Sequence, residues 1–270
     1  MNRMPSVGAG RRETGRRETG RLVGTGAAAH RGAELRIGTS GWHYPGWWGP
    51  FYPQSVKKKD ALGYYASRFD AVELNAPFYR TPTEVAVRNW RDSTPENFRF
   101  AWKASRFITH VKRLKVEKDS IALLEARLGA LGEKLGPVLF QLPPNMKCDR
   151  ERLARFIAML PRRHRYAFEF RNPDWYRPEI LDLLADHDAA FCISDHSAAP
   201  APHEVTASFV YIRNHGASGH YHGSYSEEAL VGWATAIRGW LAQARSVWCF
   251  FDNDVRSAAP SDAKQLLTMI

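Results

Sequence analysis

Residues 165–194 read RYAFEFRNPDWYRPEILDLLADHDAAFCIS, and they combine two apolar runs with one helical pattern. The runs at 165–170 and 189–194 are short and rich in aromatic and β-branched residues, which is typical of buried strands. Between them, RPEILDLLADHD at 177–188 repeats apolar residues with a period near 3.6, which predicts a helix. A strand, a helix and a second strand in this order predict a unit of two parallel strands joined by a crossover helix.

The same alternation extends along the chain. Six further apolar runs occur, at 35–40, 70–75, 98–103, 137–142, 208–213 and 246–251. Helical patterns separate most of the eight runs. After the run at 189–194, which is the sixth in chain order, only APAPHEVTA is available, and its prolines disfavour a helix. Eight units predict a (β/α)8 TIM barrel over residues 35–270, with a short or irregular sixth helix. A doubly wound open sheet is the alternative, and the absence of a GxGxxG turn after the first run disfavours it.

Composition limits the class of protein. Of the 270 residues, 44% are hydrophobic and 24% are charged, which is ordinary for a soluble globular chain. No apolar run approaches the roughly 20 residues of a membrane-spanning helix. The three cysteines are odd in number and far apart, which predicts reduced thiols and a cytoplasmic location.

The first 34 residues differ in composition from the rest. Residues 1–36 hold eight arginines and three glutamates, and so contribute +5 of the formal net charge of +10. The tandem repeat RRETG at 11–20 lies in this segment, which has almost no apolar content, so we expect residues 1–34 to be a disordered tail. A basic arm of this kind either binds nucleic acid or is a solvated extension. No membrane partner is expected, and the oligomeric state is left open.

Polar residues stand at the ends of the predicted strands from the second to the eighth. In a TIM barrel, these carboxyl ends and the loops that follow them form the active-site mouth. Because side chains alternate faces along a strand, polar residues that alternate with apolar ones are expected to point into the barrel. The residues selected in this way are Glu73, Asn75, Lys103, Gln141, Glu169, Arg171, Asp195, Arg213, His215, Asn253 and Asp254. They predict one shared polar site rather than seven separate solvated strand ends.

The segment GTSGWHYPGWWGPFYP at 38–53 continues from the first predicted strand. Its glycines and prolines exclude a helix or a central strand, so it is expected to be a loop over the same mouth. Trp42 and Tyr44 come first and are expected to form an aromatic wall, or lid, on which a sugar or base could stack. Residues 47–52 come later, and we expect part of them to fold down as a hydrophobic plug.

Seven motifs in order give the chain a family resemblance. They are GTSGWHYPGWWGPFYP, VELNAPFY, FAWKASRFITH, LGPVLFQLPP, AFEFRNPDWY, YIRNHG and CFFDND. Over residues 36–268 the chain resembles the domain-of-unknown-function 72 family, the YecE-like proteins. The resemblance implies a TIM barrel without an established activity, and it adds Tyr79 and His110 to the candidate site. Ser257 stands where this family usually has glycine, which affects the expected conformation of the last loop.

Acid–base chemistry is one use of these residues. Glu73 and Glu169 are candidates for a base, and His215 or His110 for proton transfer. Nearby cations favour ionised carboxylates, which suits a base better than an acid. Lys103 has two interpretations that the sequence leaves open. It is a Schiff-base nucleophile if its pKa is depressed, or a fixed ion-pair partner of a glutamate.

The charges also bear on the ligand. Lys103, Arg171 and Arg213 converge on the mouth, which favours an anion such as phosphate or carboxylate and predicts no metal ion. A divalent metal held by carboxylates and His215 is the alternative. Asn75, Gln141 and Asn253 are suited to hydroxyl groups. Together they predict a small, anionic, hydroxylated substrate such as a sugar phosphate or a sugar acid.

Three functions are consistent with this site. The first is an enzyme of the hydrolase, lyase or isomerase type, in which Glu73, Glu169, His215 and Lys103 carry the chemistry. The second is a phosphodiesterase that acts on nucleic acid, for which the basic tail argues. The third is a binding protein that uses the same pocket without catalysis.

Overall fold

A computed structural model describes residues 32–270 of the chain. The tail was predicted over residues 1–34, of which residues 1–31 lie outside this range, so their expected disorder and nucleic-acid binding stay predictions. Glu34, at the end of the predicted tail, is ordered instead, and its carbonyl oxygen accepts from the Val247 N–H at 2.7 Å. No helix within residues 32–270 is long and apolar enough to span a membrane.

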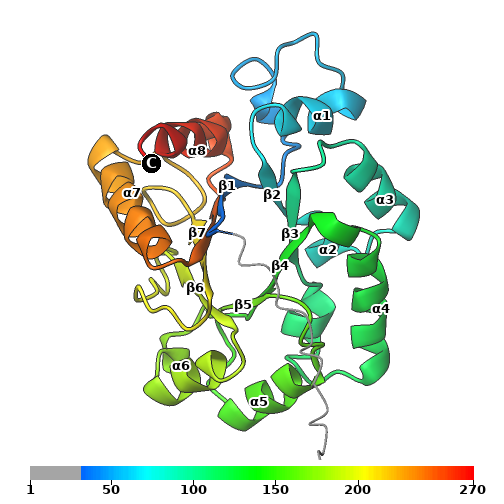
Figure 1. The fold of residues 1–270 in the computed structure, drawn as a ribbon, viewed down its shortest axis with the longest axis vertical. Helices are drawn as coiled ribbons and strands as arrows, with labels where there is room; N and C mark the ends of the chain where they lie inside the picture. Colours follow the sequence, from blue (N-terminus) through cyan, green and yellow to red (C-terminus); the bar gives the residue numbers. More distant parts are fainter. Residues whose placement is uncertain (1–31) are drawn as a thin grey trace, which may run out of the picture. The chain divides into compact units, whose positions relative to one another are not determined.

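Eight parallel strands form a closed barrel in the order β1 to β8. Figure 1 shows the strands β1 to β7 labelled around the barrel. The barrel closes where β1 pairs with β8, with Leu35 opposite Val247 and Thr39 opposite Phe251. The strands are β1 (Leu35–Ser40), β2 (Ala71–Leu74), β3 (Arg99–Lys103), β4 (Leu135–Gln141), β5 (Tyr166–Glu169), β6 (Ala190–Ser194), β7 (Phe209–Asn214) and β8 (Ser246–Phe251). The predicted α/β TIM barrel is therefore confirmed.

Helices surround the barrel in Figure 1. They are α1 (Ala61–Ala66), α2 (Ala76–Tyr79), α3 (Glu84–Asp92), α4 (Lys118–Gly129), α5 (Arg150–Met159), α6 (Pro178–Ala185), α7 (Glu227–Ala242) and α8 (Ala258–Thr268). Side-chain oxygens of Thr83, Asp149 and Ser226 accept hydrogen bonds from free backbone N–H groups and cap α3, α5 and α7. No helix joins β6 to β7, where a short or irregular helix was predicted, because proline lacks the N–H that a helix needs.

The apolar core has two layers. One cluster lies inside the barrel, where the small side chains of Ala71, Ala101 and Ala167 leave room for the rings of Trp248 and Phe250. The larger cluster packs the outer faces of the strands against the helices. Both faces of each strand are therefore buried, which explains why the strands read as continuous apolar runs in the sequence.

The aromatic segment at 38–53 packs against the rim of the barrel. Trp47 and Tyr52 are fully buried, and Phe51 packs edge-on against Trp47 at a ring-centroid distance of 5.6 Å. The Trp47 indole N–H donates to the carbonyl oxygen of Asp254 at 3.0 Å, which ties this segment to the end of β8. The outer part of the segment is thus a plug, as expected. Trp42 keeps partial exposure and contacts Trp90 edge-on at 5.8 Å.

Candidate functional site

The alternation of side chains places a polar layer directly above the apolar interior of the barrel. Each of seven strands contributes an apolar residue to the interior cluster and a polar residue two positions later. The pairs are Ala71 and Glu73, Ala101 and Lys103, Leu139 and Gln141, Ala167 and Glu169, Cys192 and Ser194, Tyr211 and Arg213, and Phe250 and Asp252. All these polar side chains are buried at the carboxyl ends of the strands, where TIM-barrel active sites lie.

Arg213 is at the centre of this layer and is fully buried. Its nitrogens donate to five residues, which are Glu73, Glu169, Asp252, Ser40 and His215. A guanidinium has five N–H groups, so Arg213 has none left for a ligand. We call Glu73, Glu169, Arg171, Arg213 and Asp252 the ion cluster.

Both glutamates of the ion cluster accept hydrogen bonds from buried donors. Glu73 accepts from the hydroxyls of Ser40 and Tyr211, each at 2.7 Å, in addition to Arg213. Glu169 accepts from Arg171 and Arg213. Burial alone would raise the pKa of each carboxyl, but the charge of Arg213 outweighs burial at Glu73, and the charges of Arg171 and Arg213 do so at Glu169. The pKa of each lies below its ordinary value, so both are ionised at neutral pH.

His215 is held between the ion cluster and Asp195. Its Nε2 accepts from Arg171 Nη2 at 2.9 Å and from Arg213 Nη1 at 3.1 Å, so Nε2 carries no proton. Its Nδ1 lies 3.2 Å from Asp195 Oδ1 and donates to it. Asp195 also accepts from the His215 backbone N–H and from the Tyr225 hydroxyl. His215 is therefore neutral, oriented and enclosed.

Lys103 differs from the other charged residues in this layer. Its side chain is buried, with 7% of the residue exposed, yet Nζ makes no hydrogen bond or ion pair with any residue in 32–270. The predicted alternative, a fixed pair with Glu73 or Glu169, does not form because the arginines occupy those carboxylates. Nζ lies 4.5 Å from the ring centroid of Phe78. Burial, followed by the charge of Arg213, lowers the pKa of Lys103 to about 8.

His110 borders the same space as Lys103. It lies on a short π-helical turn, Phe107–Val111, and its ring packs edge-on against Phe78 at 5.1 Å. Burial and the charge of Lys103 lower its pKa to about 4, so the imidazole is neutral at pH 7. Two amides complete what we call the open group, which is Lys103, His110, Asn75 and Gln141. Asn75 Oδ1 is buried without a partner, and the Gln141 amide has no hydrogen bond within the described residues.

Aromatic side chains lie at the edges of the site. The Tyr44 hydroxyl donates to the Ser40 carbonyl at 2.6 Å, which holds this ring near β1. The Tyr221 hydroxyl accepts from Arg171 Nη1 at 3.1 Å and covers that side of the ion cluster. Tyr79 is 72% exposed and has no polar contact with the ion cluster or the open group.

The end of β8 differs from the sequence prediction. Asn253 points away from the mouth, and its Nδ2 donates to the Gly223 carbonyl and to Asp262, each at 2.8 Å. Asp254 meets the plug through its backbone carbonyl. The residue that joins the ion cluster is Asp252, because it lies two positions after Phe250 and so faces the barrel interior. The same alternation along the strands places Asp252, Ser194 and Ser40 in the polar layer, and none of these three was among the site residues predicted from the sequence.

The donor set gives no support to a metal site. Within residues 32–270, no group of three or more His, Cys, Asp or Glu side chains is arranged to hold a metal ion. The prediction that the site needs no metal stays a prediction.

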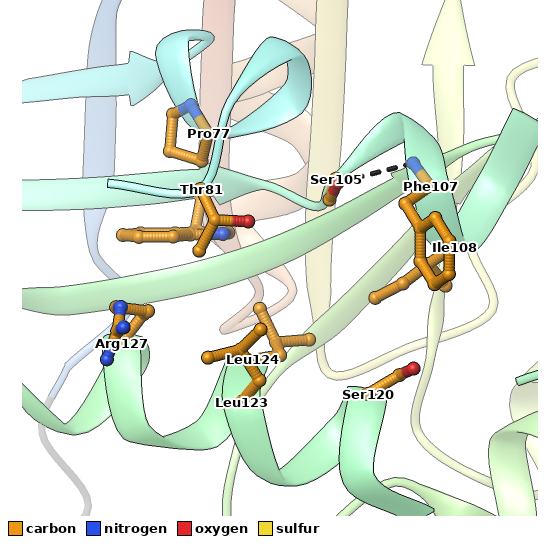
Figure 2. A pocket seen from close by; sticks show the side chains of 10 residues that line it. Pro77, Thr81, Ser105, Phe107, Ile108, Ser120, Leu123, Leu124 and Arg127 are labelled. Atoms are coloured by element: carbon orange, nitrogen blue, oxygen red, sulfur yellow. Dashed lines mark hydrogen bonds between the residues drawn. The ribbon is translucent and has the colours of Figure 1, made fainter. Parts of the chain in front are cut away.

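A separate cavity of about 180 Å³ lies outside the barrel, among α2, α4 and the π-helical turn. Figure 2 shows Pro77, Ile108 and Leu124 around it, with Arg127 at one side. Arg127 already donates to the Pro82 carbonyl at 2.8 Å and to Glu84 at 2.6 Å. The cavity is thus mainly apolar, and it lies on the opposite face of β3 from Lys103, because Trp102 lines it.

A closed eight-stranded parallel barrel with a buried polar layer at its carboxyl ends defines a TIM-barrel protein. The chain belongs to the family of proteins of unknown function DUF72, whose family model matches residues 36–270. The predicted family is therefore confirmed.

Two relatives and two solved structures illustrate the likeness. The UPF0759 protein YunF of Bacillus subtilis is 26% identical, over 87% of this chain and 94% of the relative. The UPF0759 protein YecE of Escherichia coli is 29% identical over 53% of this chain and 50% of its own length. A DUF72 protein of Thermotoga maritima is 26% identical, with a TM-score of 0.79 over 87% of this chain and 98% of that one. A DUF72 protein of Enterococcus faecalis is 21% identical, with a TM-score of 0.76 over 87% of this chain and 94% of that one. At this identity the likeness shows only that the two share a fold.

Proposed function

We propose that the chain is an enzyme of the lyase or isomerase type whose reactive group is the amine of Lys103. Its substrate is a small, hydroxylated, anionic molecule with a carbonyl group, such as a sugar phosphate or a sugar acid. One observation carries the proposal. Lys103 is a buried amine at the carboxyl end of a barrel strand, and it has no ion-pair or hydrogen-bond partner within the described residues.

The hydrogen bonds of the ion cluster favour Lys103 over the other catalytic candidates. Glu73 and Glu169 are buried and accept from arginines whose charges outweigh burial and lower the pKa of each carboxyl, so both are weak bases. His215 uses both ring nitrogens on fixed partners. We therefore assign these three residues to the support of the site. The charges of the two glutamates and the ring nitrogen of His215 hold Arg213 beside Lys103, where burial and then the charge of Arg213 disfavour the protonated amine.

The proposed chemical step is Schiff-base formation. The lone pair of neutral Lys103 Nζ attacks the carbonyl carbon and forms a carbon–nitrogen bond. The carbonyl oxygen leaves as water and carries the two protons that the amine loses, so atoms and charge balance. Neutral His110 is suited to relay these protons, because it borders the same Phe78 ring and has one ring nitrogen without a partner in the described part of the chain. The imine nitrogen then takes up one proton from solvent, and the protonated imine withdraws electrons from the neighbouring carbon.

The substrate class follows from the groups without partners. The Asn75 and Gln141 amides are suited to hydroxyl groups. Among residues 32–270, Arg171 Nη1 has only the Tyr221 hydroxyl as a partner, and an acidic group of the substrate would replace that contact. Trp42 and Tyr44 would flank the less polar face of the substrate as an aromatic lid.

Reductive trapping tests the proposal. The full-length protein is incubated with pyruvate, dihydroxyacetone phosphate or glyceraldehyde 3-phosphate, and then with borohydride, which reduces an imine to a stable secondary amine. We expect intact mass and peptide mapping to show one adduct, on Lys103, with at least one probe. Lys103→Arg keeps the positive charge and should remove the adduct, whereas Lys59→Arg on the surface should retain it. Adducts confined to surface lysines, or no adduct with any of the probes, would refute the proposal.

A further inference from the structure

A second cleft lies on the outside of the barrel, between α1, α8 and the aromatic segment at 38–53, which we call the plug segment. Figure 1 shows α1 and α8 as neighbours around the barrel. The cleft has a volume of about 650 Å³, which is within the roughly 300–1,000 Å³ typical of small-molecule sites. We call it the α1–α8 cleft. It shares no lining residue with the ion cluster or the open group.

All the charged side chains that line the α1–α8 cleft are positive. Arg68, Arg256 and Lys264 line it, and none of its lining residues is acidic. None of the three cations forms an ion pair with a carboxylate in residues 32–270. Two exposed arginines on other helices, Arg88 and Arg155, each pair with a glutamate one helical turn away. Three unpaired cations around one cleft attract an anion.

One of these cations, Arg256, lies on a turn with an unfavourable backbone conformation. Arg256 and Ser257 are consecutive non-glycine residues in the left-handed region, with φ values of 55° and 61°. The Ser257 hydroxyl donates to the Gly46 carbonyl at 3.2 Å, which joins this turn to the plug segment. A glycine would adopt this conformation without strain, but glycine at 256 would remove the guanidinium from the cleft.

The floor of the cleft is aromatic. Phe51, Tyr64 and Phe69 line it, and Phe51 stacks on Phe69 with ring centroids 6.0 Å apart. The Arg68 guanidinium lies 5.2 Å from the Tyr64 ring centroid, so a cation and a ring form one continuous surface. Ser261 adds a hydroxyl that makes no hydrogen bond with the described residues. Rings beside unpaired cations suit a molecule that has both a flat ring and a phosphate.

We propose that the α1–α8 cleft is a binding site for a nucleoside phosphate. The phosphate contacts Arg256, Lys264 and Ser261, and the base lies against Phe51 and Tyr64 beside Arg68. The site is independent of the reaction at Lys103. It gives the protein a second ligand on the outer wall of the barrel, next to the plug segment.

Calorimetric titration with AMP tests this assignment on the full-length protein in 150 mM salt. We expect one site per chain, with adenosine and inorganic phosphate each binding at least tenfold more weakly than AMP. The double variant Arg256→Ala with Lys264→Ala should weaken AMP binding at least tenfold. The control double variant Lys112→Ala with Lys115→Ala removes the same charge from another surface and should bind AMP normally.

A third variant separates binding from folding. Arg256→Gly relieves the left-handed strain and removes the guanidinium, so it should unfold at a higher temperature and yet bind AMP more weakly. The proposal is overturned if AMP does not bind, if phosphate binds as tightly as AMP, or if the control variant loses as much affinity as the cleft variants. Lys103→Arg should leave AMP binding unchanged, which distinguishes this site from the barrel mouth.

Discussion

Replacement of Lys103 by methionine tests the electrostatics of the barrel mouth. The pKa of Lys103 falls from 10.5 to about 8, and each pKa unit is worth roughly 1.4 kcal/mol. Burial of the protonated amine therefore costs about 3 kcal/mol of folding free energy at pH 7. Methionine fills a similar volume without a charge, and it avoids that cost. We expect Lys103→Met to raise the free energy of unfolding by about 3 kcal/mol at pH 7.

The pH dependence fixes the sign of this prediction. Between pH 8 and pH 10.5 the unfolded chain keeps its proton on Lys103 while the folded protein releases it, so wild-type stability rises with pH in this window. Below pH 8 both states are protonated and the full cost applies. The advantage of the methionine variant should therefore be largest at or below pH 7 and should shrink towards pH 10.5.

Urea unfolding of the two proteins at pH 7 and at pH 10, followed by circular dichroism, measures both quantities. Other groups that titrate in this range are the same in the two proteins, so their contributions cancel in the difference. A Lys103→Met variant that is less stable than the wild type at pH 7 would show that the amine is stabilised by its surroundings. An advantage that does not change between pH 7 and pH 10 would refute the depressed pKa.

Two further substitutions test other parts of the structure. Glu169→Gln leaves Arg171 and Arg213 buried without one of their carboxylate partners, and we expect urea unfolding to show a loss of about 3–5 kcal/mol. The exposed Glu151→Gln, which removes a surface pair, should change stability by less than about 0.5 kcal/mol, and equal effects of the two would contradict the account of the ion cluster. Ser257→Gly should raise the unfolding free energy by about 1 kcal/mol because glycine adopts φ 61° without strain. A decrease would mean that the hydrogen bond to Gly46 outweighs the strain.

The fold was predictable because its signals are local. Strand and helix periods repeat along the chain, and the strands found in the structure differ from the predicted runs by at most two residues at either end. The polar layer was also predictable, since alternation within a strand decides which side chains face the interior. Asn253 and Asp254 were wrongly predicted to face the mouth because they were selected for their nearness to the end of β8. Counting in twos from Phe250 leads to Asp252 instead of Asn253 or Asp254.

The amino-acid sequence by itself determined the barrel, the family and the set of polar residues at its mouth, because these depend on periodicity within short segments. The tertiary structure alone decided how those residues pair. Arg213 from β7 reaches Glu73 from β2, Glu169 from β5 and Asp252 after β8, and it leaves Lys103 on β3 without a partner among residues 32–270. Which cation is neutralised depends on distances across the barrel between residues far apart in the chain, and these distances exist only once the barrel has closed.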